Sequence, residues 1–205
     1  MKLLKSLTLA TVIASSYAMA DATATAELKQ KLSGLNSFTA NFNQTVFDSQ
    51  NQLLQQSSGD LAIAKPNKLR WNVVSPDEEL MLSDGDSLWF YNPFLEQVSV
   101  YDLEQSIAQS PFMLLTSSDE SAWNNYKITK LANGYKLEPK TTNSLVWLQI
   151  SLNGAAIESL ESLDNQGQRS LFKLSEFNSN EKIDSAKFTF TIPTGIELDD
   201  QRTTK

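Results

Sequence analysis

The feature that most constrains the fold of this chain is a two-residue hydrophobic alternation that recurs along much of its length. The clearest runs are Phe38, Ala40, Phe42 and Val46, followed by Leu69, Trp71 and Val73. Successive side chains of a β-strand point to opposite faces of a sheet, so an apolar residue at every second position predicts a strand with one buried face. The sequence therefore predicts a protein that is mainly β.

Short turn motifs separate the alternating runs. They are Ser58-Gly59, Asp84-Gly85, Asn133-Gly134, Asn153-Gly154 and Asn165-Gln166-Gly167. Asn-Gly and Asp-Gly supply the positive φ angles of tight hairpins, which join antiparallel neighbours. Their spacing predicts about eleven or twelve strands, and a single antiparallel sheet of that width curls. We expect an open, incomplete β-barrel.

Two segments break the alternation. From Glu27 to Leu35 the apolar residues fall at i, i+4 and i+7, which predicts one amphipathic helix. From Asp102 to Asn125 the alternation is absent: Ser110-Pro111 can begin a short helix that carries Phe112 to Leu115, and Ser118 can cap a further turn. We expect the N-terminal helix and this short helical insertion to cover the concave face of the sheet, because a curved sheet must bury that face.

The N-terminus has the three parts of a secretory signal peptide. Lys2 and Lys5 make a basic start, residues 7–14 are apolar, and Ala18-Met19-Ala20 is a small-x-small cleavage motif. The apolar stretch is far shorter than the ~20 residues that span a bilayer. The pattern predicts export rather than a membrane helix.

The cleavage motif also divides the chain. We expect residues 1–20 to be removed and residues 21–205 to form a single domain. Asp21 rather than a Cys follows the motif, so the exported protein is expected to be soluble and without a lipid anchor at its new N-terminus.

Composition removes several kinds of chemistry. The 205 residues include no Cys and no His, and 17 basic residues stand against 24 acidic ones, for a formal charge of −7. Catalysis by His or Cys, His or Cys metal sites, haem ligation and disulfides are therefore absent from the candidate functions. The acidic excess argues against a nucleic-acid partner, which needs a surplus of Lys and Arg.

Paired carboxylates are the remaining candidates for catalysis. They are Asp77-Glu78-Glu79, Asp84 with Asp86, Asp119-Glu120 and Asp199-Asp200. Each pair lies in or beside a predicted turn, which is typical of solvated loop charge, and the spacing around Asp84 lacks the further oxygen ligands of a Ca²⁺ loop. The sequence predicts no enzyme, no metal and no cofactor.

Several stretches together resemble one family. They are Gly59-Asp60-Leu61, Lys65-Pro66-Asn67, Leu69-Arg70-Trp71, Leu82 to Gly85, Leu88 to Val98, Ser110 to Leu115, Lys187 to Phe190, Pro193, Gly195, and Asp199 to Arg202. The run Leu-Trp-Phe-Tyr-Asn-Pro-Phe before Pro-Phe-Met-Leu is the specific part. In these motifs the chain resembles the LolA family of periplasmic outer-membrane lipoprotein carriers over essentially its whole predicted mature length.

The resemblance implies an open β-barrel with a helical lid over a hydrophobic cavity. It also implies that a soluble periplasmic carrier takes acylated lipoproteins from an ATP-driven release complex of the inner membrane and delivers them to an outer-membrane receptor. The related receptor is itself lipid-anchored through a Cys, which this sequence lacks. An acidic surface without an evident apolar edge favours a monomer.

Strand phase and family position together suggest the residues of the site. The cavity wall is expected to include Phe42, Val46, Leu69, Trp71 and Met81, and the lid is expected to consist of Phe112, Met113, Leu114 and Leu115. An alternative is that these residues are ordinary core.

The motif departs from the family at one position. Many members carry Arg before the Pro of Lys65-Pro66, and the resemblance implies that this Arg hydrogen-bonds the lid and holds it closed. Lys65 offers a point charge rather than a planar fork of five donors. The latch is expected to be looser here, or to be shared with Arg70.

Two other functions remain open from the sequence. A carbohydrate- or peptidoglycan-binding module could use Trp89 and Tyr91 as stacking platforms. A periplasmic sensor of lipidated cargo could use the same kind of sheet, although such sensors usually carry a second domain.

Overall fold

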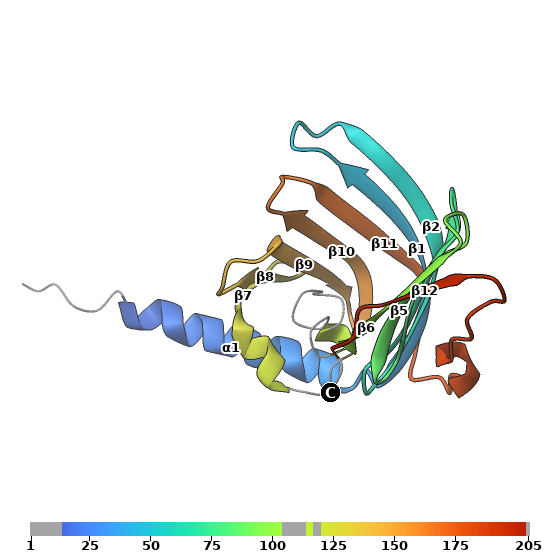
Figure 1. The fold of residues 1–205 in the computed structure, drawn as a ribbon. Helices are drawn as coiled ribbons and strands as arrows, with labels where there is room; N and C mark the ends of the chain where they lie inside the picture. The colour runs from blue at the N-terminus through green and yellow to red at the C-terminus, as the bar shows by residue number, and fades with distance from the viewer. Residues whose placement is uncertain (1–13, 104–113, 117–119, 204–205) are drawn as a thin grey trace, which may run out of the picture.

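One long, strongly curved sheet with a helix packed at one end makes up the protein (Figure 1). The computed structural model describes residues 14–103, 114–116 and 120–203. The elements are α1 (Ala14–Ser33), β1 (Ser37–Phe47), β2 (Leu53–Ala64), β3 (Lys68–Ser75), β4 (Glu79–Asp84), β5 (Ser87–Asn92), β6 (Gln97–Asp102), the 3-10 helix η2 (Glu120–Asn125), β7 (Tyr126–Leu131), β8 (Gly134–Pro139), β9 (Leu145–Asn153), β10 (Ala156–Asp164), β11 (Arg169–Ser179), the 3-10 helix η3 (Ser185–Phe188) and β12 (Glu197–Asp200).

The sheet is open, as the sequence predicts. Its 12 strands are ordered β12-β6-β5-β4-β3-β2-β1-β11-β10-β9-β8-β7, so β12 and β7 form two edges that do not pair with each other. Every pair of neighbouring strands in this order is antiparallel except the pair at one edge. There β12 pairs with β6 in parallel, with Glu197 opposite Gln97. The expectation of a wholly antiparallel sheet is therefore wrong at this edge, because a long connection rather than a hairpin leads into β12.

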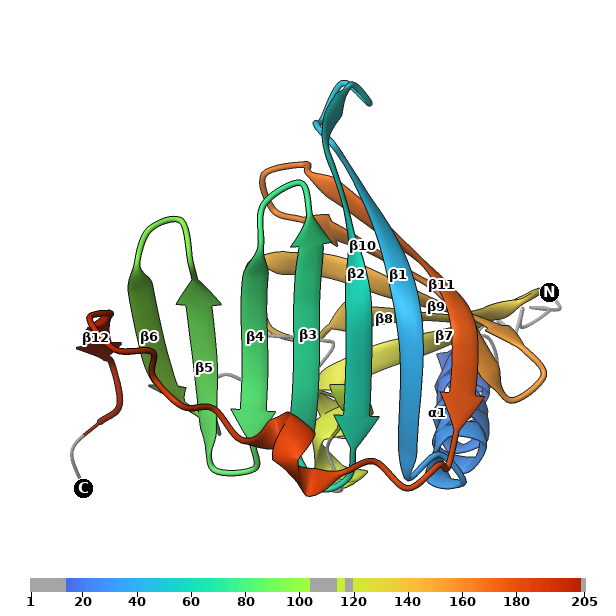
Figure 2. The same ribbon diagram turned by 90° about the vertical axis from the view of Figure 1, so that its right-hand side faces the viewer.

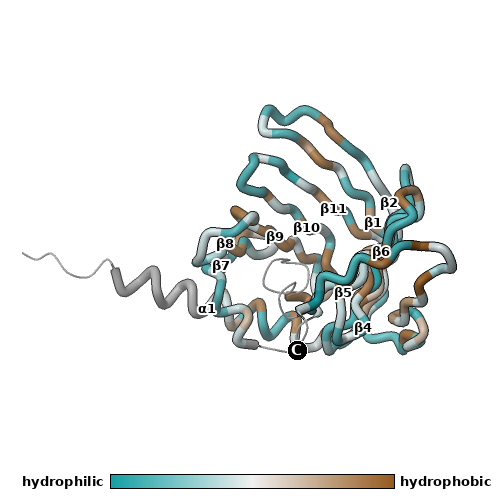
Figure 3. Tube along the Cα trace, in the orientation of Figure 1, coloured by the Kyte–Doolittle hydropathy of each residue, from teal (hydrophilic) through white to brown (hydrophobic). Residues whose placement is uncertain are grey.

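Alternation decides which side chains face the concave side. On β1, Phe38, Ala40 and Phe42 are buried, whereas Asn41 is exposed. Register then extends the apolar face across the sheet: Leu61 lies opposite Trp71, and Trp71 lies opposite Met81. Figure 3 shows the apolar residues recurring at intervals along these strands.

Ser58-Gly59 is not a turn, which corrects the sequence-based expectation. Both residues lie inside β2, at a shift in its register with β3. A Cβ at Gly59 would collide with the backbone oxygen of Asn72 and with the ring of Phe42. The glycine is therefore there to admit a close approach rather than a reversal of the chain.

Helical segments pack against the concave face at the end of the sheet next to α1 (Figure 1). Leu28 and Leu32 of α1 pack into the same core as Leu114, Leu115 and Trp123 of the insertion. Helix α1 ends at Ser33, before Leu35, whose backbone N–H donates to the Leu32 carbonyl. The predicted helix thus extends further toward the N-terminus and ends slightly earlier, next to Gly34, which disfavours helix continuation.

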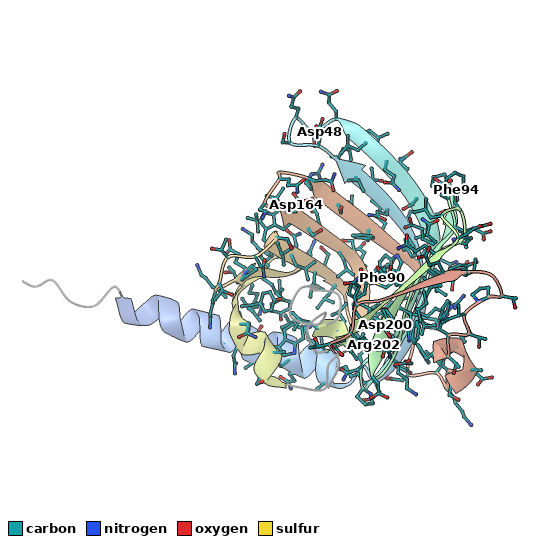
Figure 4. The ribbon with its side chains drawn as sticks, in the orientation of Figure 1. Asp48, Phe90, Phe94, Asp164, Asp200 and Arg202 are labelled. Carbon is teal, nitrogen blue, oxygen red and sulfur yellow. The ribbon has the colours of Figure 1, made fainter. Side chains whose placement is uncertain are left out.

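The C-terminal segment crosses the convex face of β3, β4, β5 and β6 on its way from β11 to β12 (Figure 2). Phe188 of η3 is buried, and the ring of Phe190 lies 5.5 Å from Trp89 and 5.8 Å from Tyr91, measured between ring centroids. Arg202 follows β12, close to Asp200 (Figure 4), and its guanidinium lies over the Trp89 ring. These contacts cover part of the convex face with the protein's own chain.

Candidate functional site

A pocket of about 350 Å³ opens on the concave face of the sheet, called the inner face below. The convex face is called the outer face. Its walls come from strands β1, β3, β4, β5, β6 and β11. The lining residues are Gln44, Trp71, Val73, Glu79, Leu80, Met81, Phe90, Tyr91, Asn92, Gln97, Ser99 and Phe172. The wall is mostly apolar, and the size is in the range of pockets that hold small molecules.

Trp71 is the centre of the apolar wall. Its ring lies 4.4 Å from Phe42 and 5.2 Å from Phe172 between centroids, the latter edge to face. Aromatic contacts of this kind hold each ring in place. Beside it on the same face, Met81 and Phe90 oppose one another across β4 and β5 and remain partly exposed. The aromatic part of the wall around Trp71 thus lies next to two accessible apolar side chains, Met81 and Phe90.

The predicted cavity residues lie on this inner face at different depths. Trp71 and Met81 line the pocket, and Phe42 packs behind Trp71. Leu69 is fully buried in the core beside the helices, and Val46 is buried nearer the β1–β2 hairpin. The structure therefore brings three of the five together at the pocket, while a role of any of them in binding remains a prediction.

Most of the pocket residues were not predicted as cavity residues from the sequence, and three of them show why. Phe90 could have been found from its spacing to Leu88, which places both on one face of β5. Gln44 breaks the apolar alternation of β1, so the pattern pointed away from it. Phe172 comes from β11, and no local signal connects that strand to β3.

The predicted lid is described in part. Leu114 and Leu115 are buried in the core against the helical segments. Phe112 and Met113 lie outside the described residues. Thr116 is also buried, and its carbonyl accepts a 3.0 Å hydrogen bond from the Asn67 backbone N–H in the β2–β3 connection. That bond ties the end of the predicted lid to the sheet.

Lys65 contacts the helix that ends beneath the sheet. Its Nζ donates to the Leu32 carbonyl at 2.9 Å, near the C-terminus of α1, where the helix dipole favours a cation. Burial lowers the pKa of Lys65 from its ordinary value. Arg70 lies on the other face of β3, because it alternates with Leu69 and Trp71. The structure does not bring the two predicted latch residues together.

Polar side chains form part of the pocket wall near the β5–β6 hairpin. Asn92 donates to the Glu79 carboxylate at 3.1 Å. At the tip of the β5–β6 hairpin, Phe94 is 86% exposed and Leu95 is exposed beside it. Figure 4 places Phe90 near the centre of the molecule and Phe94 at its periphery.

Two of the candidate catalytic carboxylates, Asp84 and Asp200, have structural partners. Asp84 accepts backbone hydrogen bonds from Asp86 and Ser87 and a 2.9 Å bond from Trp89 Nε1. Partial burial opposes its ionisation, but these donors outweigh that effect and lower the pKa of Asp84. The Arg202 guanidinium lowers the pKa of Asp200 to about 2. Both carboxylates therefore stabilise turns or the C-terminal segment.

Nor do Trp89 and Tyr91 form an open platform for sugar stacking. Phe190 lies against both rings, and Arg202 lies over Trp89.

Among the described residues, no helix is both long and apolar enough to cross a membrane.

An open sheet that curves around an apolar pocket, with helical segments packed at one end, defines the class as an open half-barrel with an apolar pocket. The model of the family described as "Outer membrane lipoprotein carrier protein LolA" matches residues 33–191. The chain belongs to the LolA family, which confirms the assignment made from the motifs.

Curated relatives support that assignment over nearly their full length. An outer-membrane lipoprotein carrier protein of Vibrio vulnificus is 42% identical over 86% of this chain and 89% of the relative. The protein of the same name from Serratia proteamaculans is 39% identical over 98% of each chain. Among solved structures, an uncharacterized conserved protein from Thermus thermophilus shares the fold with a TM-score of 0.53, at 11% identity over 88% of this chain and 98% of that one.

Proposed function

We propose that this protein is a soluble periplasmic carrier that binds the acyl anchor of lipoproteins and delivers them to the outer membrane. The observation that carries the proposal is the apolar pocket formed by Trp71, Met81 and Phe90 in a chain of the LolA family, whose curated relatives are named outer-membrane lipoprotein carrier proteins. Binding and release, rather than catalysis, is the activity.

The physical need for a carrier follows from the hydrophobic effect. Removing an acyl chain from water is favourable by ~0.8 kcal/mol per CH₂, so a multiply acylated protein does not cross an aqueous space unshielded. The aromatic wall around Trp71 and the accessible Met81 and Phe90 supply apolar surface for such chains.

Release needs an opposing term. Leu114 and Leu115 are buried against the core, and displacing them from the inner face exposes apolar surface that the cargo must then cover. Part of the cargo's binding free energy is thereby offset, which keeps the affinity low enough for onward transfer. We assign Phe112 and Met113 to the same lid on the grounds of the sequence alone. Lys65 supports the closed state through the end of α1.

The partners follow from this role. Cargo comes from an ATP-driven release complex of the inner membrane and passes to an outer-membrane lipoprotein receptor. The basic start and small-x-small motif of residues 1–20 support export, and Asp21 after the motif supports a mature form without an anchor. A monomer suffices for this handover.

The test is displacement of a fluorescent apolar probe from the purified mature protein. A triacylated lipopeptide should displace the probe, whereas the same peptide without acyl chains and a soluble glycan should not. Equal effects of the acylated and unacylated peptides, or failure of the acylated peptide to compete, would rule out the carrier function.

A further inference from the structure

Two polar side chains interrupt the apolar inner face beside the pocket. Gln44 of β1 lies between Phe42 and Val46 on that face, and Ser57 lies directly opposite it on β2. Ser57 is only 7% exposed, and its Oγ donates to Gln44 Oε1 at 2.9 Å. Buried polar groups are more informative than buried apolar ones, because they cost free energy unless they are paired.

The Ser57 bond sets the direction of the Gln44 carboxamide. A carboxamide has one acceptor oxygen and two N–H donors. Because Ser57 engages the oxygen, the Nε2 end is directed away from Ser57, toward the pocket that Gln44 lines. Phe172 is the partner of Gln44 on the β11 side, so the donors lie beside the aromatic wall.

A ligand that fills this pocket separates those donors from solvent. A purely hydrocarbon ligand leaves them unpaired, which weakens its binding, whereas a ligand with a suitably placed acceptor pairs with them. We propose that Gln44 recognises the carbonyl oxygen at the head of an acyl chain, and that Ser57 positions it. This inference rests on the proposed function and specifies that the pocket recognises the acyl carbonyl group of the cargo.

The position of Gln44 also determines the orientation of the acyl chain in the pocket. The hydrocarbon chain packs along Trp71 and Phe172, while the ester or amide group at its head comes to rest against Gln44. The peptide then leaves past the polar side chains of Asn92 and Glu79. Gln44 is thus a residue that determines specificity and is not only part of the wall.

The experiment compares two lipopeptides that differ only in the linkage of their chains. One carries two palmitoyl esters on an S-glyceryl cysteine, and the other carries hexadecyl ethers, which lack the carbonyl acceptor. Each competes for the fluorescent probe on the full mature protein. A third peptide, with a single N-palmitoyl amide, shows whether an amide carbonyl serves as well as an ester.

Wild-type protein should bind the ester peptide about tenfold more tightly than the ether peptide, the order expected when a ligand leaves a buried donor unpaired. Gln44→Met should remove this preference by weakening the ester peptide alone. Ser57→Ala should reduce the preference by about threefold, because it leaves the carboxamide free to turn. Gln56→Met, an exposed residue of β2 that points to the other face, is the matched control and should keep the preference.

The outcomes separate two failures. An ester preference that is unchanged in Gln44→Met, or absent in the wild type while both peptides still compete, would overturn the role of Gln44 and leave the carrier function standing. Failure of both peptides to compete with the probe on wild-type protein would overturn the carrier function and this inference with it.

Discussion

The two faces of the strands β3 to β6 carry similarly apolar side chains but meet different surroundings. On the outer face Leu82, Val98 and Val100 are 0% exposed. On the inner face Met81 is partly exposed and Phe90 is 40% exposed at the pocket. Neighbouring residues of a single strand, Met81 and Leu82, therefore fall on opposite sides of this difference.

The cause is the origin of the cover. Part of the outer face is covered by the protein's own C-terminal segment, through Phe188 and Phe190 (Figure 2). Among the described residues, helical segments cover the inner face toward Leu69, and the region of Met81 lines a pocket. Apolar surface that the chain covers permanently contributes to stability, whereas apolar surface left at a pocket is available for a ligand.

Alanine substitutions at neighbouring positions should show this contrast most strongly. Leu82→Ala should lower the free energy of unfolding by about 3 kcal/mol, because it leaves a cavity in a sealed core. Met81→Ala should cost about 1 kcal/mol or less, because its side chain is already partly in contact with solvent. Urea unfolding followed by circular dichroism measures both. Equal losses would show that the two faces are equivalent.

A charge on the inner face should separate binding from folding. Met81→Glu should weaken binding of the acylated lipopeptide by at least about tenfold, because a carboxylate in the pocket must lose water when the chain enters. The far-UV spectrum should stay the same. Val74→Glu, at an exposed position of β3, serves as the control. Undiminished binding in Met81→Glu would remove this pocket as the site.

The outer seal should respond to acid through Asp84. Its lowered native pKa means that the ionised form stabilises the fold above the unfolded value of about 3.9. This stabilisation disappears as pH falls through the lower native pKa. Asp84→Asn should lower the free energy of unfolding by about 1.5 kcal/mol at pH 7, because solvent screens a partly exposed carboxylate. The difference in stability between the variant and the wild type should shrink toward pH 3. A cost that stays the same from pH 7 to pH 3 would contradict this role of the Asp84 carboxylate.

The cover of the inner face should respond to alkali through Lys65. Burial lowers its native pKa, so the unfolded chain binds more protons at high pH and stability rises as pH increases through the native pKa toward about 10.4. Lys65→Met should cost about 1 kcal/mol at pH 7 through the lost bond to Leu32, and it should lack this alkaline rise. Chemical unfolding at pH 7 and pH 10 tests this. Lys127→Met is the surface control, and an alkaline rise retained in Lys65→Met would assign the effect to another group.

Much of the architecture could be predicted because it depends on neighbours in sequence. The alternation from Phe38 to Phe42 led directly to an inward-facing strand, and the motif around Trp89 led to the family. Ser58-Gly59 misled because a glycine that admits Phe42 and β3 has the same local appearance as one in a turn. The parallel pairing of β12 could not be seen, because it depends on the path of the chain across the outer face.

The sequence by itself determined most of the hairpins, the inward-facing strands, the N-terminal helix and the family, since periodicity and turn chemistry act over a few residues. Only the tertiary structure decided which apolar face is sealed and which lines a pocket, and that Phe172 and Gln44 join Trp71 there. It also decided that Lys65 contacts Leu32 while Arg70 lies on the outer face. These relations depend on the curvature and register of the sheet, which bring distant strands together and leave no trace in any short stretch of sequence.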